Sequence, residues 1–144
     1  MNIIDLGTLI CKKAIYSRYF NWAAVGDIYQ LNDRTIHDYP ALLVTFIGPH
    51  TAVRNTTRYR LVLYYFDRLA SDNSNSTQIY SNSVEVLKNL INDIRHEDNI
   101  LKVSDEIQFT PFIGVEVQAL SDRCCGAYAT LDITVRNENN CFIS

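Results

Sequence analysis

Cysteine and histidine are the residue types in this chain whose side chains most readily act as nucleophiles, bases or metal ligands. The chain carries four cysteines and three histidines, at Cys11, Cys124, Cys125, Cys141, His37, His50 and His96. Adjacent Cys124 and Cys125 lack the two-residue gap that lets paired thiolates converge on zinc, and no histidine stands at ligand spacing from them. The spacing therefore favours buried or reduced thiols over a metal site or a disulfide framework.

A catalytic use of these residues would need a thiolate beside a base or a positive group. The best candidate for such a catalytic site is a Cys–His pair, in which Cys124 or Cys125 lies beside one of the three histidines in the fold. No nucleophile elbow, phosphate-binding glycine loop, zinc signature or EF-hand loop is present, and the chain has only five glycines. We therefore expect no enzyme activity, no catalytic residue, no metal and no cofactor.

The composition indicates one globular domain over residues 1–144, with 47% hydrophobic and 20% charged residues. A formal net charge of −3 argues against tight binding of duplex DNA, which depends on Lys and Arg contacts to phosphate. No apolar run approaches the roughly 20 residues of a membrane span, and lysines follow the first apolar stretch instead of preceding it. We expect neither a signal peptide nor a membrane anchor.

The first half of the chain predicts a helix and then a long hairpin. Apolar residues recur at helical spacing over residues 3 to about 20, and residues 20–40 show no clear pattern. Residues 41–47 form a nearly all-apolar run, closed by Gly48-Pro49, that predicts a strand buried on both faces. Residues 58–66 predict its partner strand, and the aromatic and apolar stripe of that strand favours a core position (Tyr59, Leu61, Leu63 and Tyr65).

The second half predicts a helix over residues 77–95 and two further strands. The helix carries an apolar stripe, and Ser and Asn residues before it are suited to cap its first turn (Tyr80, Val84, Leu87, Ile91 and Ile94 form the stripe). Residues 107–113 predict a strand that Pro111 confines to an edge or a bulge. Residues 120–126 predict a turn in which Gly126 takes a positive φ, and residues 127–136 alternate with period two. Residues 137–144 are predicted to form a flexible tail.

These elements predict an α+β fold in the order α-β-β-α-β-β. Its mostly antiparallel sheet would have about four to five strands and would pack against one or two helices.

Two groups of residues are candidates for a subunit or partner interface. The connection over residues 50–57 is longer than a hairpin loop needs, and Val53 and Arg54 suit contact with a partner's edge strand and carboxylates. Arg58 and Arg60 share a face of the following strand, and arginine is enriched at interfaces. Asp122-Arg123 could form a second polar anchor. The alternative to an interface is that the hairpin residues, or the loop with Asp122-Arg123, are simply exposed to solvent.

The long pair over 41–66, the helix near 77–95 and the closing pair from Phe109-Thr110-Pro111-Phe112 to residues 127–135 resemble phage tail-terminator and tail-completion proteins. The segment Cys125-Gly126-Ala127-Tyr128 is also similar to small structural proteins of Bacteroidetes phages, including the crAss-like group.

This resemblance implies a virion protein that forms a hexameric or dodecameric ring at a head-to-tail junction or tail end. Its implied partners are copies of itself and neighbouring connector, portal-side or tail-tube proteins, with DNA only passing through the lumen. A ring needs a heterologous interface with two different patches on each subunit. The alternatives are a small binding module with an apolar pocket and, less favoured, a cysteine-dependent enzyme.

Overall fold

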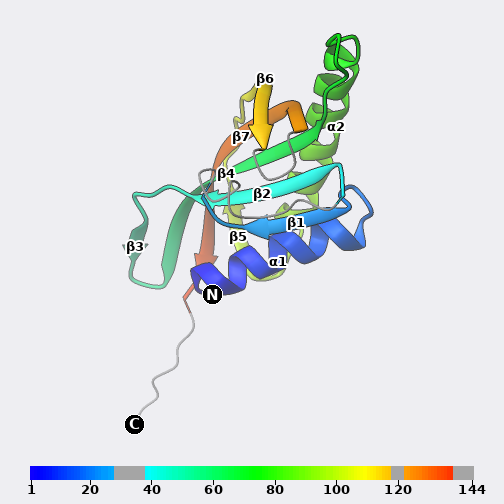
Figure 1. The fold of residues 1–144 in the computed structure, drawn as a ribbon. Coiled ribbons are helices and arrows are strands. Elements are labelled where there is room, and N and C mark those ends of the chain that lie inside the picture. Colours follow the sequence, from blue (N-terminus) through cyan, green and yellow to red (C-terminus); the bar gives the residue numbers. More distant parts are fainter. Residues whose placement is uncertain (28–37, 118–121, 138–144) are drawn as a thin grey trace.

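The computed structural model describes residues 1–27, 38–117 and 122–137, except for the side chains of residues 113–117 and 122. The described chain is α+β, with two helices and seven strands (Figure 1). The elements are α1 (Ile3–Tyr16), β1 (Trp22–Val25), β2 (Ala41–Phe46), β3 (Thr51–Val53), β4 (Thr56–Arg68), α2 (Ser76–Arg95), β5 (Ile100–Val103), β6 (Phe109–Val117) and β7 (Asp122–Arg136).

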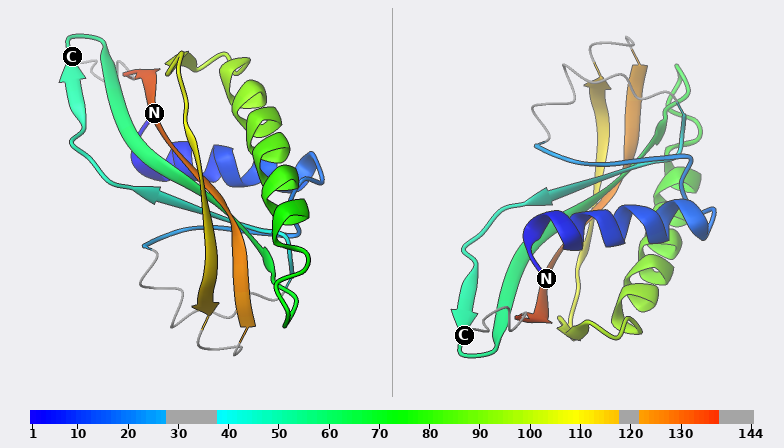
Figure 2. Two further views of the ribbon diagram at one scale, coloured as in Figure 1. Left: turned by 90° about the horizontal axis from the view of Figure 1, so that it is seen from above. Right: turned by 90° about the horizontal axis from the view of Figure 1, so that it is seen from below.

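The strands form one mixed sheet in the order β1-β2-β4-β7-β5, with β3 added to β4 and β6 added to β7. Among the strands of the described residues, only β1 and β2 run parallel, and every other pair is antiparallel. The 13-residue β4 and the 15-residue β7 pair along most of their lengths and form the centre of the sheet. Both helices cover the same face (Figure 2), and the apolar residues of that face form the main core.

The predicted α-β-β-α-β-β order is therefore wrong, because it lacks β1, β3 and β5. These strands have only three or four residues, and none shows an apolar–polar alternation: β1 is half-buried throughout, β3 is exposed throughout, and β5 is buried only at its ends. Such short segments carry too little periodicity to be recognised from sequence. The prediction that β2 is buried and pairs with the following long strand is confirmed.

Helix α1 begins with a reciprocal capping box, in which Asn2 and Asp5 each accept from the other's backbone N–H. The helix ends at Tyr16, four residues before the predicted end. Two residues later Arg18 takes a positive φ of 65°, which is not compatible with a continuing helix. Gly7 lets the helix lie close to the sheet, since a Cβ at this position would be 2.7 Å from the Val25 side chain.

Helix α2 confirms the predicted helix within one residue, and Leu87, Ile91 and Ile94 of the predicted stripe are buried. Leu90, predicted to widen the stripe, is buried too, but Tyr80 and Val84 are only half-buried, and Ile79 and Ser83 are buried instead. The expected side-chain cap is absent. The Asn75 side chain accepts from the Ala70 N–H and donates to the Arg68 carbonyl, so it holds the preceding loop.

The face of the sheet without helices carries a second, aromatic cluster. Phe66 is fully buried, and its ring lies 5.9 Å from Tyr64 and 5.2 Å from Phe112. Tyr128 adds a further ring 5.6 Å from Tyr64. Aromatic stacking thus stabilises the end of this face at which β4, β6 and β7 meet.

The predicted turn over residues 120–126 is wrong over residues 122–126, because β7 already begins at Asp122. Gly126 pairs with Phe66 inside the sheet, and its φ is not positive. A Cβ at Gly126 would lie 1.9 Å from the Tyr65 carbonyl oxygen, so close backbone approach is what requires glycine here. Pro111 lies on the edge strand β6 beside a register shift, as predicted. The predicted tail lies almost wholly outside the described residues.

Candidate interaction site on the β3–β4 hairpin

The connection over residues 50–57 is not a long loop, contrary to the prediction. Strand β3 pairs with the start of β4, and Val53 stands opposite Thr56, so only Arg54 and Asn55 form the turn. The extra length is used for a short hairpin, which stands out to the left in Figure 1, away from α2. The prediction missed β3 because the segment has no buried residue.

The outer strand of this hairpin is exposed, although the hairpin is firmly held. All three residues of β3 are exposed, and Val53 retains 64% of its accessible surface. The Asn137 N–H donates to the Asn55 carbonyl at 2.7 Å, and the Thr57 hydroxyl donates to Asn137 Oδ1 at 2.6 Å. These bonds tie the tip to the end of β7, so the hairpin presents an ordered surface.

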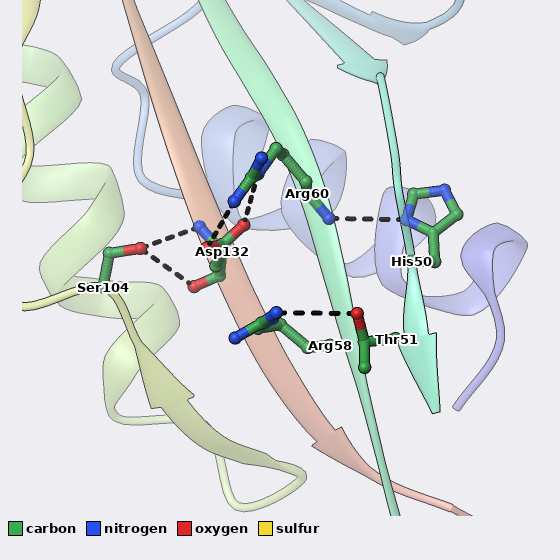
Figure 3. A network of polar contacts seen from close by, with 6 residues as sticks. All are labelled: His50, Thr51, Arg58, Arg60, Ser104 and Asp132. Atoms are coloured by element: carbon green, nitrogen blue, oxygen red, sulfur yellow. Dashed lines mark hydrogen bonds and ion pairs between the residues drawn. The ribbon is translucent and has the colours of Figure 1, made fainter. Parts of the chain in front are cut away.

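Arg60 is fixed by a carboxylate directly across the central strand pair (Figure 3). Its Nε lies 3.0 Å from Asp132 Oδ1 and its Nη2 lies 3.3 Å from Oδ2, a bidentate contact between opposed residues of β4 and β7. The hydrogen bond first, and the carboxylate charge second, raise the pKa of the Arg60 guanidinium. Because solvent screens an exposed ion pair, this contact adds little to stability, and its main effect is to orient Arg60.

Backbone contacts on both sides of this pair complete the network in Figure 3. The Ser104 hydroxyl accepts from the Asp132 N–H at 2.8 Å and donates to its carbonyl at 3.3 Å. His50 Nδ1 accepts from the Arg60 N–H at 3.4 Å. Asp132 and His50 form hydrogen bonds with Arg60, and Ser104 forms hydrogen bonds with Asp132. Arg60 is therefore held by contacts inside its own subunit.

Arg58 lies on the same face as Arg60 but has no carboxylate among the described residues. Its guanidinium donates to the Thr51 hydroxyl at 3.5 Å, the limit of a hydrogen bond. It borders a hollow of about 200 Å³ that is also lined by Lys102, Ser104, Asp105, Asp132 and Thr134. With Arg60 included, three cations face two carboxylates here, so the surface favours an incoming anionic side chain.

The other predicted pair lies at the far end of the sheet. Arg123 is exposed and donates to Asn73 Oδ1 at 3.2 Å. It lies near the start of β7, whereas the hairpin contacts the end of that strand, and 13 residues of strand separate them by roughly 40 Å. For Asp122 the structure describes only the backbone, which pairs with Val117. The six predicted residues therefore form two separate surfaces. One is the hairpin with Val53, Arg54, Arg58 and Arg60, and the other is the start of β7 with Asp122 and Arg123.

Sequence reasoning missed Asp132, Ser104 and Lys102. Asp132 was visible only as one polar residue in the alternation of the last strand, and Arg60 precedes it by 72 positions. The sequence signal that could have found it is the opposite charge of two residues on the polar faces of the two longest predicted strands.

Neither Cys124 nor Cys125 lies beside a histidine among the described residues. Cys124 stands opposite Arg68, whereas His50 contacts Arg60, eight residues along β4. His96 ends α2, while Cys125 lines a hollow at the start of that helix. His37 and Cys141 lie outside the described residues. Burial raises the pKa of Cys125, and the nearby Asp67 charge raises it further.

Cys11 is expected to react with iodoacetamide roughly 100-fold more slowly than a free thiol at pH 8. Burial raises its pKa from 9.0 to about 11, and each pKa unit lowers the thiolate fraction about tenfold in this range. Peptide mass spectrometry of the native protein would follow the labelling, with the urea-unfolded protein as control. Labelling at the unfolded rate would show that Cys11 is an accessible, reactive thiol.

A second hollow, of about 290 Å³, lies between the start of α2 and strands β6 and β7, and its lining is mainly apolar (Ser76, Thr77, Tyr80, Pro111, Phe112, Cys125 and Gly126). The described part of the chain contains no cluster of three or more potential metal ligands. No helix within the described ranges is long and apolar enough to cross a membrane.

A scan against protein-family models found no match, and a search of curated proteins found no relative.

Proposed function

We propose that this chain is a non-catalytic structural subunit that binds its neighbours through the β3–β4 hairpin. The observation that carries the proposal is an ordered, protruding hairpin whose outer strand is exposed. Among the described residues β3 pairs only with β4, and an unpaired strand edge is a template for another strand. Because Asn137 already holds the tip, docking costs little ordering entropy.

The charges of the site suit the same role. Arg54 is exposed in the turn, and Arg58 lies on the open face without a carboxylate partner in the described part of the chain. Both can donate hydrogen bonds to a neighbour's carboxylate, while Arg60 stays bound to Asp132. The partner surface is therefore expected to offer a strand edge with Asp or Glu beside it.

In this proposal the assembly is a homo-oligomeric ring, hexameric or dodecameric, in a phage virion at the head-to-tail junction or tail end. The resemblance of the segments that form β2–β4, α2 and β6–β7 supports it. Neighbouring connector, portal-side or tail-tube proteins would be the further partners. The net charge of −3 suits a lumen that lets DNA pass, because a strongly basic lining would retain it.

The hollow beside α2 favours a second candidate, a small module that binds an apolar side chain or ligand. Its lining by Tyr80, Pro111 and Phe112 supplies apolar walls, and its size of about 290 Å³ is at the lower end for a ligand pocket. Such a module would be monomeric. Light scattering, on the protein alone and with its neighbours, separates the two candidates.

The double variant Val53→Asp/Arg54→Glu tests the hairpin as an assembly surface. Both side chains are exposed, so the variant should keep the circular dichroism spectrum and melting temperature of the wild type. The assembled fraction in light scattering and negative-stain images should fall roughly tenfold or more, since a buried carboxylate and a reversed charge would oppose docking.

Lys88→Glu is the matched control, because it reverses one exposed charge on α2, away from the hairpin. It should assemble as the wild type does. Complete particles formed by the hairpin variant would show that the hairpin is only a connector.

A further inference from the structure

Helix α1 exposes much more apolar surface than its role in covering the sheet requires. The described part of the chain exposes seven large hydrophobic side chains, and four of them lie on this helix (Ile3 36%, Ile4 76%, Ile15 42% and Tyr16 82%). Exposed apolar side chains gathered on one element indicate a contact surface.

Part of this surface forms a regular stripe along the helix. Ile4, Thr8, Cys11 and Ile15 are separated by four, three and four residues, a spacing that places them on one face. This face lies beside the one that Leu6, Ile10 and Ala14 bury against the sheet, and Cys11 is itself partly buried. The stripe therefore continues the apolar side of the helix into solvent.

The spacing of the stripe is the same when read in either direction. Two copies of the helix laid antiparallel would therefore match along their whole length. Ile4 would meet Ile15 of the second copy, and Thr8 would meet Cys11 of the second copy, each contact occurring twice. A self-complementary patch of this kind is the requirement for a two-fold, isologous contact.

Charge selects the same arrangement. Asp5 and Lys12 each follow a stripe residue by one position, so both lie on the same flank of the stripe. An antiparallel pair brings Asp5 of one copy beside Lys12 of the other, twice, and opposes the helix dipoles. A parallel two-fold pair would instead put the two copies of this flank on opposite sides of the contact, so it would gain no ion pair between Asp5 and Lys12.

We infer that α1 is the contact surface for a second copy of this chain, through a two-fold antiparallel pair of α1 helices. The contact is separate from the hairpin and does not rest on the proposed function. If both contacts form, the two-fold contact joins two rings into one stacked assembly.

Disulfide trapping with Ile4→Cys and Ile15→Cys chains, mixed and oxidised by copper–phenanthroline and O₂, tests the register. Both chains carry Cys11→Ala and Cys141→Ser, so that the buried Cys124 and Cys125 are the native thiols that remain. The mixture should give cross-linked dimers at least about tenfold faster than either chain alone, because like positions lie roughly 16 Å apart along an antiparallel pair.

The control is Gln78→Cys, an exposed position on α2, mixed with the Ile4→Cys chain. Equal cross-linking in this mixture and in the Ile4→Cys/Ile15→Cys mixture would overturn the inference. Faster cross-linking of Ile4→Cys with itself would also overturn it, since that result indicates a parallel pair.

Charge reversal gives an independent readout by sedimentation velocity. Asp5→Lys and Lys12→Asp should each weaken the dimer about tenfold, because symmetry turns two attractions into two repulsions. Asp5→Lys also removes the Asp5 half of the capping box, so Lys12→Asp is the cleaner single variant. The double variant should recover most of that loss. A wild-type protein that stays monomeric at millimolar concentration, or a double variant weaker than both single ones, would contradict the two-fold contact.

Discussion

Leu87→Ala is expected to lower the free energy of unfolding by roughly 2 to 5 kcal/mol. Leu87 lies in the middle of α2, is fully buried, and packs in the core between the helices and the sheet. Truncation removes its apolar contacts and leaves a cavity that two long central strands cannot readily close. A domain of this size is stable by only about 5 to 15 kcal/mol, so the loss should shift the urea midpoint strongly.

The neighbouring residue supplies the control for this prediction. Lys88 is exposed, and Lys88→Ala should change the unfolding free energy by less than about 0.5 kcal/mol. Urea titrations followed by circular dichroism at 222 nm would measure both variants. A Leu87→Ala loss below about 0.5 kcal/mol would mean that this face of α2 is solvent-exposed.

Period-based prediction succeeded where an element is long and has one buried face. The alternation from Ala127 to Val135 was predicted correctly because every second residue of this part of β7 is buried against the helices. Helix α2 was predicted correctly for the same reason, although the burial of Ile79 and Ser83 shows that its buried face is turned from the predicted one. Periodicity reports which residues are buried more reliably than it reports what covers them.

The same reasoning failed where structure depends on pairing between distant segments. Nothing local in Thr51–Val53 indicates a strand, because its order comes from backbone bonds to β4 and not from burial. The site shows the same limit. Arg58 and Arg60 could be selected by residue type, but Asp132 could not be assigned to Arg60 before β4 and β7 were known to be neighbours.

Gly126→Ala is expected to lower the free energy of unfolding by about 3 kcal/mol or more, beyond the usual cost of overpacking. An added Cβ would lie 1.9 Å from the Tyr65 carbonyl oxygen and 2.9 Å from its carbon. Both are backbone atoms of a central strand, so no side-chain rotation relieves the clash, and β4 and β7 would have to separate locally.

Gly126→Asn distinguishes this explanation from a turn with positive φ. Asparagine tolerates the left-handed region, so a turn glycine is replaced by Asn at small cost, whereas a strand glycine against a backbone oxygen is not. Gly48, whose φ is 63° and whose neighbours leave space for a Cβ, is the matched control, and Gly48→Asn should cost less than about 1 kcal/mol. Urea unfolding of the four proteins, wild type included, should therefore give similar free energies of unfolding for Gly126→Ala and Gly126→Asn. Both should be far below the value for Gly48→Asn. If Gly126→Asn instead matches Gly48→Asn, then Gly126 lies in a turn, and β7 begins after it.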